Sequence, residues 1–179
     1  MYKKYLLSII LTIILSVVPT TLTAQSALPK QENIIQVVTI TDYRISRLII
    51  YIDYNYNVSR ELSEKIVKIA FKYGNKTQFP TAIDILTIIA IESAFDVRAE
   101  SRKTKARGLM QILYKKSSFD IHKNIEDGVW LLNDYADRLS KPEAAIHAYN
   151  VGIGNYRKGI RNQKYVKKFK KIKKILENI

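Results

Sequence analysis

The sequence predicts an all-α fold organised as one domain. Apolar residues recur at the three- and four-residue spacing of amphipathic helices over most of the chain. A length of 179 residues suits one compact domain, so several independent domains are not expected. With 47% hydrophobic residues and only 6 Gly and 4 Pro, the chain can bury a core and is not low-complexity.

The first 24 residues have the layout of a secretory signal. Lys3 and Lys4 precede an apolar run over residues 5–18, and small residues around Ala24 offer a cleavage site. That run is shorter than the roughly 20 residues that span a bilayer. We therefore expect an exported protein, located in the periplasm or cell envelope. An uncleaved membrane anchor is the alternative, because Leu22 is a poor residue three places before the cut.

The next segment, residues 25–40, has no sustained period and predicts a tether. The domain is then expected to cover residues 41–179. At its start, residues 45–52 and 62–73 each place apolar side chains on one helical face, and Ser59 is a suitable cap for the second helix.

A third helix is expected to begin at Thr81, because Thr81 and Asp84 have the spacing of a capping box. Residues 82–91 are apolar almost all round, which predicts a buried central helix. The isoleucine content would also suit a buried strand, but the start signal and the length favour a helix.

The second half of the chain continues the helical pattern. A basic loop over residues 96–107 is followed by an amphipathic helix over residues 125–139. Ser140 and Glu143 are expected to form a capping box for a short helix that reaches Asn150. Ten Lys or Arg then occur between residues 157 and 174 with no acid among them, on an amphipathic terminal helix.

The composition limits the available chemistry. The chain has no cysteine and 2 histidines, which excludes disulfides, thiolate nucleophiles, cysteine-bound metals and a three-histidine metal site. No metal or cofactor is expected. The net charge of +14, or +12 without the signal, predicts an anionic partner.

The most informative residue is Glu92, which directly follows the apolar run of the third helix. A carboxyl group leaving an isoleucine-rich wall should be partly desolvated, and its pKa should therefore rise. Such a group suits general-acid chemistry near neutral pH. The alternative is a structural glutamate that pairs with a nearby cation.

Three ordered motifs place Glu92 in a wider pattern. They are Glu92-Ser93-Ala94-Phe95, then Gly108-Leu109-Met110-Gln111, then Ala148-Tyr149-Asn150-Val151-Gly152. The set resembles the soluble-type (Slt-like) lytic transglycosylases, a branch of the lysozyme-like superfamily, over roughly residues 80–156. Asn124 and Gly128 also match that family's Asn-Ile-x-x-Gly helix. One departure is Lys105, which stands where the family usually has a glycine before Leu-Met-Gln.

The resemblance implies a lysozyme-like domain that cleaves peptidoglycan. Family members break the β-1,4 bond between N-acetylmuramic acid and N-acetylglucosamine and close a 1,6-anhydro ring. Glu92 would be the general acid and then the base. The substrate-binding residues implied are Ser93, Met110, Gln111, Tyr149 and Asn150. Helix capping by Ser93 and core packing by Met110 or Tyr149 are alternative roles.

Two other functions are alternatives for the same residues. A second carboxylate from Asp96, Asp120 or Asp127 would make the protein a hydrolase (muramidase). A non-catalytic cell-wall-binding protein is the other alternative. The expected partner is the glycan strand, and the basic stretch over residues 157–174 could also meet an anionic membrane surface. Secretion, conjugation and phage assembly are candidate settings, whereas nucleic acid is not expected because no base-reading module is present.

Overall fold

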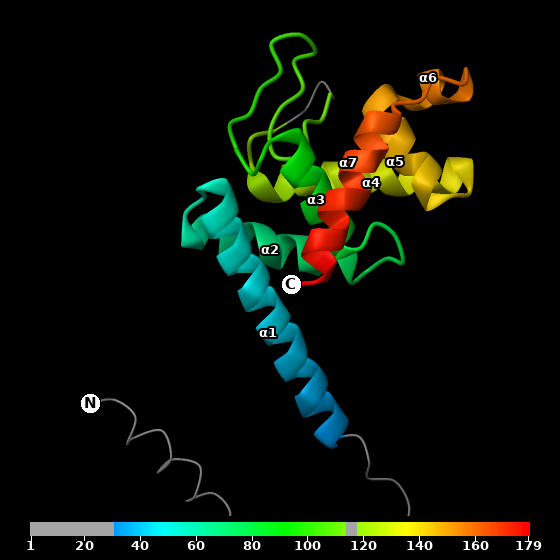
Figure 1. Cartoon of the computed structure of the whole chain (residues 1–179). Coiled ribbons are helices and arrows are strands. Elements are labelled where there is room, and N and C mark those ends of the chain that lie inside the picture. Colours follow the sequence, from blue (N-terminus) through cyan, green and yellow to red (C-terminus); the bar gives the residue numbers. More distant parts are fainter. Residues whose placement is uncertain (1–30, 114–117) are drawn as a thin grey trace, which may run out of the picture. The chain divides into compact units, whose positions relative to one another are not determined.

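The computed structural model describes residues 31–113 and 118–179. Within these ranges the chain is helical, with isolated bridges in place of strands, which confirms the all-α prediction. The helices are α1 (Gln31–Tyr56), α2 (Arg60–Gly74), α3 (Ala82–Glu92), α4 (Ile121–Leu139), α5 (Pro142–Val151), α6 (Ile153–Arg157) and α7 (Gln163–Glu177), as labelled in Figure 1.

The N-terminal part of the chain is described only from Gln31. The predicted signal over residues 1–24 and the first part of the predicted tether lie outside the described residues. Residues 31–40, which belong to the predicted tether, form the start of α1. Once a helix is nucleated, each added residue gains a backbone hydrogen bond without needing an apolar stripe. The chain divides into two units, Met1–Gln36 and Val37–Ile179, and the second contains all that follows. Of the described helices, none is both long and apolar enough to cross a membrane.

At the centre of the second unit lies α3, as the sequence predicts. Thr81 Oγ1 accepts a hydrogen bond from the Asp84 backbone N–H (3.2 Å), and the Asp84 carboxylate accepts one from the Thr81 N–H (2.9 Å). Every residue from Ala82 to Ala90 is buried. A helix without a polar face must be covered on all sides, and α2 and α7 both pack against it (Figure 1).

The approach of α2 to α3 depends on one glycine. Ser59 caps α2 by accepting from the Leu62 N–H, and the helix ends at Gly74 as predicted. A Cβ atom at Gly74 would lie 2.1 Å from the Ala82 backbone nitrogen. Only glycine therefore allows the end of α2 to meet the start of α3 this closely.

The connection between α4 and α5 differs from the prediction. Ser140 does not begin a capping box; it closes α4 in the left-handed conformation, with φ of 55°. Lys141 precedes α5 without a side-chain cap, and Pro142 starts the helix. The left-handed turn uses Ser140 to end one helix, which leaves it one position too early to cap the next. The predicted stop is confirmed, because α5 ends at Val151 before Gly152, whose φ is 82°.

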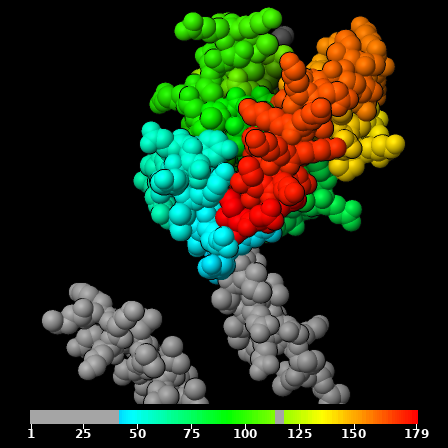
Figure 2. All heavy atoms as spheres, viewed as in Figure 1, coloured from blue at the N-terminus to red at the C-terminus, as the bar shows by residue number. Residues whose placement is uncertain are grey.

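The C-terminal helix α7 is amphipathic, as predicted. Val166, Phe169 and Leu176 are buried, while most of the lysines between them are exposed. Tyr165 is buried as well. In Figure 2 the orange and red spheres of this segment form part of the domain's visible surface. Because its inner face packs on both α3 and α5, α7 belongs to the domain core as well as to its charged exterior.

Candidate active site

The Glu92 carboxyl group lies at the C-terminal end of α3 and is half-buried. Tyr165 of α7 donates its hydroxyl to Glu92 Oε1 at 2.6 Å. Burial raises the pKa of Glu92, whereas the Tyr165 hydrogen bond and the Lys168 charge oppose that rise. The pKa remains above that of an ordinary carboxyl group, as expected from the position of Glu92 after the apolar run.

Two tyrosines, the buried Tyr165 and the partly buried Tyr149, adjoin this carboxyl group. The pKa values of Tyr149 and Tyr165 both lie well above the ordinary value, chiefly because of burial and then because of the nearby Glu92 charge. Both phenols therefore stay protonated and act as donors. Tyr149 donates to the Met110 carbonyl oxygen (2.6 Å), so the acid's tyrosine partner is Tyr165 and not Tyr149.

A cavity of about 400 Å³ opens beside Glu92. Its walls come from three parts of the chain: the loop that follows α3, the helix α4, and the end of α5. Four of the six predicted site residues line it: Glu92, Gln111, Tyr149 and Asn150. The remaining lining residues are Ser101, Thr104, Ala106, Ile112, Leu113, Leu131, Tyr135, Val151 and Gly152.

Ser93 and Met110 do not line this cavity. Ser93 follows the last residue of α3 and donates its hydroxyl to the Ile89 carbonyl oxygen at 3.1 Å, which is a capping role. Met110 is fully buried, and a Cβ atom at Gly128 would lie 2.3 Å from its sulfur. Ser93 therefore stabilises the end of α3 and Met110 fills the core, and neither side chain lines the cavity.

The loop that carries Gln111 is held in a tight conformation. Gln111 Nε2 donates to the carbonyl oxygens of Ala99 and Gly108, each at 3.0 Å. Gly108 has φ of 75°, and a Cβ atom there would lie 2.5 Å from Asn124 Nδ2. Lys105 keeps a left-handed backbone with φ of 64°. The departure from the family's glycine at this position therefore preserves the loop conformation that a glycine would favour.

Asn124 of α4 fastens this loop to the helix. Its Oδ1 accepts from the Met110 N–H (2.8 Å), and its Nδ2 donates to the carbonyl oxygens of Arg107 (2.9 Å) and Ser118 (3.0 Å). The side chain is 1% exposed. A buried amide with three partners in one loop fixes that loop against α4.

Asn150 sits on the exposed rim of the cavity. Its Oδ1 accepts from Asn162 Nδ2 at 2.8 Å. Asn162 also caps α7 by accepting from the Tyr165 N–H at 3.1 Å. The motif at the end of α5 is thus connected to the helix that carries the acid's tyrosine partner.

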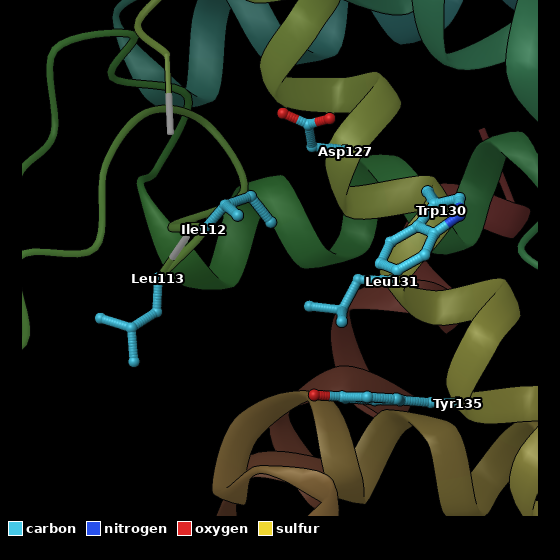
Figure 3. Close-up of a pocket in the computed structure, with 6 residues that line it drawn as sticks. All are labelled: Ile112, Leu113, Asp127, Trp130, Leu131 and Tyr135. Carbon is cyan, nitrogen blue, oxygen red and sulfur yellow. The ribbon is translucent and has the colours of Figure 1, made fainter. Parts of the chain in front are cut away.

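A second hollow of about 420 Å³ adjoins the Glu92 cavity. The two share Ile112, Leu113, Leu131 and Tyr135 as lining residues. Figure 3 shows Trp130, Leu131 and Tyr135 on α4 facing the loop residues Ile112 and Leu113. Because most of these side chains are apolar, the hollow extends the cavity along a mostly apolar wall. Trp130 in this wall is 64% exposed.

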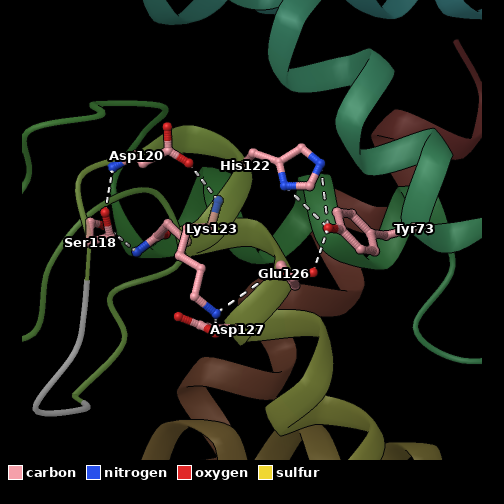
Figure 4. A network of polar contacts seen from close by, with 8 residues as sticks. Tyr73, Ser118, Asp120, His122, Lys123, Glu126 and Asp127 are labelled. Atoms are coloured by element: carbon pink, nitrogen blue, oxygen red, sulfur yellow. Dashed lines mark hydrogen bonds and ion pairs between the residues drawn. The ribbon is translucent and has the colours of Figure 1, made fainter.

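The alternative carboxylates have other contacts. Asp96 accepts from the Arg98 N–H (2.8 Å) and braces its loop, and Asp120 caps α4. Asp127 pairs with Lys123, which also reaches Glu126 (Figure 4). Among the lining residues described for the Glu92 cavity, Glu92 is the sole carboxylate, and Asp127 lines the adjoining hollow.

Neither histidine contributes to the Glu92 cavity. His122 lies within hydrogen-bonding distance of Tyr73 Oη (3.3 Å) in the network of Figure 4, and His147 is buried in α5. Among the residues that the structure describes, no cluster of three or more metal-ligating side chains is found.

Tyr165 is a site residue that the sequence pattern does not predict. The residue precedes Val166 and is four positions before Phe169, so it lies on the apolar face of α7 and has the pattern of a core aromatic. That periodicity predicts its burial. Its pairing with a carboxyl group 73 residues away depends on how the helices pack.

Comparison with known proteins identifies the family. No curated protein and no solved structure matches the chain. The family model described as the transglycosylase SLT domain matches residues 68–172, which include Glu92, the Gln111 loop, Asn150 and Tyr165. The chain therefore belongs to the SLT transglycosylase family, a lysozyme-like family that includes the soluble lytic transglycosylases.

Proposed function

We propose that the protein is a peptidoglycan lytic transglycosylase that cleaves the β-1,4 bond between N-acetylmuramic acid and N-acetylglucosamine and forms a 1,6-anhydro product. The observation that carries the proposal is the half-buried Glu92 carboxyl group with its raised pKa, held by Tyr165 at the wall of the cavity. Family membership supports a peptidoglycan substrate.

In the first step, protonated Glu92 donates its proton to the glycosidic oxygen. The bond from the muramic C1 to that oxygen breaks, and the leaving sugar departs with a free hydroxyl. The carbonyl oxygen of the muramic acetamido group attacks C1 and takes up the developing positive charge. The raised pKa increases the fraction of Glu92 that is protonated at any given pH, which favours its action as the acid.

In the second step, the Glu92 carboxylate removes the proton from the muramic 6-hydroxyl. The 6-oxygen attacks C1, the bond from the acetamido oxygen to C1 breaks, and the anhydro ring closes. Glu92 ends protonated and no water is consumed, so the atoms balance without a second carboxylate. The sole carboxylate among the described cavity lining fits this scheme.

Substrate contacts are assigned to the residues that line the cavity. Because Gln111 Nε2 is bound to the loop, its side-chain oxygen is the group offered to sugar hydroxyls or amides. Asn150 contributes an amide at the rim, and Tyr149 contributes ring surface. Ser93 and Met110 hold the end of α3 and the loop in place.

Export belongs to the same proposal. A signal over residues 1–24 would deliver the protein to the periplasm or cell envelope, where the substrate lies. There the enzyme would remodel the wall or open it locally for secretion, conjugation or phage assembly. Recovery of the processed chain from a periplasmic fraction is the expected result, and an uncleaved chain in the membrane fraction would favour the anchor.

The activity is tested by incubating the purified protein with murein and weighing the released muropeptides by mass spectrometry. The expected products carry the 1,6-anhydro mass and lack a reducing end. Reducing-end products would identify a hydrolase instead, with Asp127 in the adjoining hollow as the first carboxylate to examine. Binding without any release would indicate a non-catalytic wall protein.

A further inference from the structure

Two polar contacts join α7 to α3, one towards each end of α3. Towards its C-terminal end, Tyr165 Oη donates to Glu92 Oε1 at 2.6 Å. Towards its N-terminal end, Lys173 Nζ donates to Asp84 Oδ1 at 2.7 Å. The proposed mechanism involves only the first contact, and the second remains to be explained.

The two contacts have matching spacing on both helices. Glu92 lies eight residues after Asp84 on α3, and Lys173 lies eight residues after Tyr165 on α7. The order is reversed, so the helices run antiparallel, and each interval corresponds to about 12 Å of helix rise. Phe169, midway between the two α7 residues, is buried in the core. Both polar contacts are therefore made in a single register of the helix pair.

The Asp84 end of this pair is firmly fixed. Asp84 is 2% exposed, and its other carboxylate oxygen accepts from the Thr81 N–H (2.9 Å) and the Thr81 hydroxyl (2.7 Å). Lys173 is partly shielded, with 32% of its side chain exposed, and lies 3.8 Å from Glu177 on its own helix. A buried carboxylate bound at the start of a helix leaves little freedom to the lysine that pairs with it.

We propose that Lys173 is a positioning residue, whose ion pair with Asp84 sets the register of α7 on α3 and thereby holds the Tyr165 hydroxyl on Glu92. A slip of α7 by one residue would move that hydroxyl by about 1.5 Å along the axis and turn it by roughly 100°. A hydrogen bond of 2.6 Å does not survive such a shift. Any effect of this positioning on catalysis by Glu92 rests on the proposed function, whereas the register of the two helices does not.

The charged and titratable groups near Glu92 determine the sign of the effect. Tyr165 and Lys168 of α7 both lower the pKa of Glu92, whereas burial raises it, and Tyr149 of α5 also lies near the carboxylate. Without the Tyr165 contact, less remains to offset the increase in the pKa of Glu92 that burial causes. Displacing α7 is expected to raise the pKa of Glu92 further.

The test measures the pKa of Glu92 directly in the full chain, by following glutamate side-chain ¹³C chemical shifts through a pH titration. Glu92→Gln assigns the resonance. Lys173→Met is expected to raise the pKa by roughly one to two units, the shift that loss of the Tyr165 hydrogen bond would cause, which is a tenfold to hundredfold change in the protonation equilibrium. Lys173→Arg should restore the wild-type pKa.

Two further variants separate positioning from general charge. Lys170→Met removes one α7 charge that pairs with the exposed Glu143, and it should leave the pKa of Glu92 unchanged. In a Tyr165→Phe background, Lys173→Met should add a much smaller shift, because most of its effect passes through the tyrosine hydroxyl and only the weaker influence of the Lys168 charge remains to be displaced.

A folded Lys173→Met protein with the wild-type pKa would overturn the proposal, and so would an equal shift in the Tyr165→Phe background. If Lys173→Met does not fold, Asp84→Asn carries the same test, because its side-chain oxygen can still accept from Thr81. The titration needs no substrate. A wild-type protein inactive on murein would thus refute the proposed function and leave this readout intact.

Discussion

Glu92 combines two opposing influences within one side chain. Burial at the end of α3 favours the protonated acid, and the Tyr165 hydroxyl favours the carboxylate. The proposed reaction needs both forms in turn, first as a proton donor and then as a base. A carboxyl group stabilised in only one form would perform one of these steps poorly.

Glu92→Gln is expected to lower the release of muropeptides by a factor of about 10² to 10⁴, because an amide cannot transfer the proton. The folded pKa of Glu92 is raised, so the native state binds the proton more tightly than the unfolded chain. Its contribution to stability is therefore present at low pH and lost as pH rises through the folded pKa. Glu92→Gln should accordingly be as stable as the wild type at neutral pH or slightly more stable, as thermal unfolding would show. Retained activity would refute the acid assignment.

Tyr165→Phe should move the alkaline limb of the profile of kcat/KM against pH to higher pH. The hydroxyl stabilises the Glu92 carboxylate, so its removal raises the pKa of the acid. A hydrogen bond to a charged group is worth about 1.5–3 kcal/mol, which corresponds to roughly one to two pH units. Tyr156→Phe, at a partly exposed tyrosine that lines neither hollow, is the matched control and should leave the limb in place. A limb that moves to lower pH would contradict this account.

At the scale of elements, the loop between α3 and α4 depends on a side chain of the helix that follows it. Asn124 satisfies one N–H and two carbonyl groups of that loop. Gln111 is carried on the same loop, so its placement in the cavity follows from the position of α4.

Asn124→Ala is expected to destabilise the fold by roughly 2–4 kcal/mol and to weaken substrate binding as well. The change leaves a buried Met110 N–H without its acceptor, and a buried unsatisfied group costs about 1–3 kcal/mol by itself. Chemical denaturation measures the loss of stability, and KM for murein fragments reports the position of the loop. Asn133→Ala on the same helix is the control. Equal stabilities for the two variants would show that the Asn124 hydrogen bonds to the loop do not stabilise the fold.

The hollow beside the Glu92 cavity offers an exposed aromatic ring on α4. Since the two spaces share four lining residues, a glycan strand that leaves the cavity in this direction meets Trp130. Trp130→Ala is expected to raise KM for long glycan strands roughly fivefold, or about 1 kcal/mol, through lost contact with a sugar face. Short fragments should be unaffected, and so should Tyr54→Ala, at a ring 87% exposed on α1. An equal effect on short fragments would place the strand elsewhere.

Across the whole molecule, the dominant property is positive charge. The chain carries 30 basic and 16 acidic side chains, and α7 presents exposed lysines on its outer side. The inner side of that helix meets Glu92 and Asp84. The same helix therefore supports the site and contributes exposed positive charge to the surface of the domain.

Binding to murein should weaken as salt increases from about 0.05 M to about 0.5 M, because surface charges are then screened. The triple change Lys164→Gln, Lys167→Gln and Lys171→Gln should reduce binding about tenfold at low salt and flatten the salt dependence. Sedimentation with murein measures both effects.

A matched variant distinguishes local from general charge. The triple change Lys65→Gln, Lys68→Gln and Lys72→Gln removes three exposed cations from α2. If α7 is the contact surface, the α2 variant should bind nearly as well as the wild type. Equal losses would assign the effect to net charge alone.

Local sequence patterns predicted much of the fold. The Thr81 capping box, the stop at Gly74 and the burial of α3 were all predictable, because caps and helical periods act over a few neighbouring residues. Ser140 shows where such signals compete, since one polar side chain adjoins two helix ends and the backbone turn decides between them.

The sequence by itself determined the all-α class, the buried α3 helix and the family motifs, with Glu92 at the end of that helix. Only the tertiary structure decided which tyrosine contacts the acid, that Ser93 and Met110 lie outside the cavity lining, and that Lys173 reaches Asp84. The physical reason is range. Helix formation responds to neighbours within a turn or two, whereas a contact between residues 92 and 165 exists only once two helices have packed in one register.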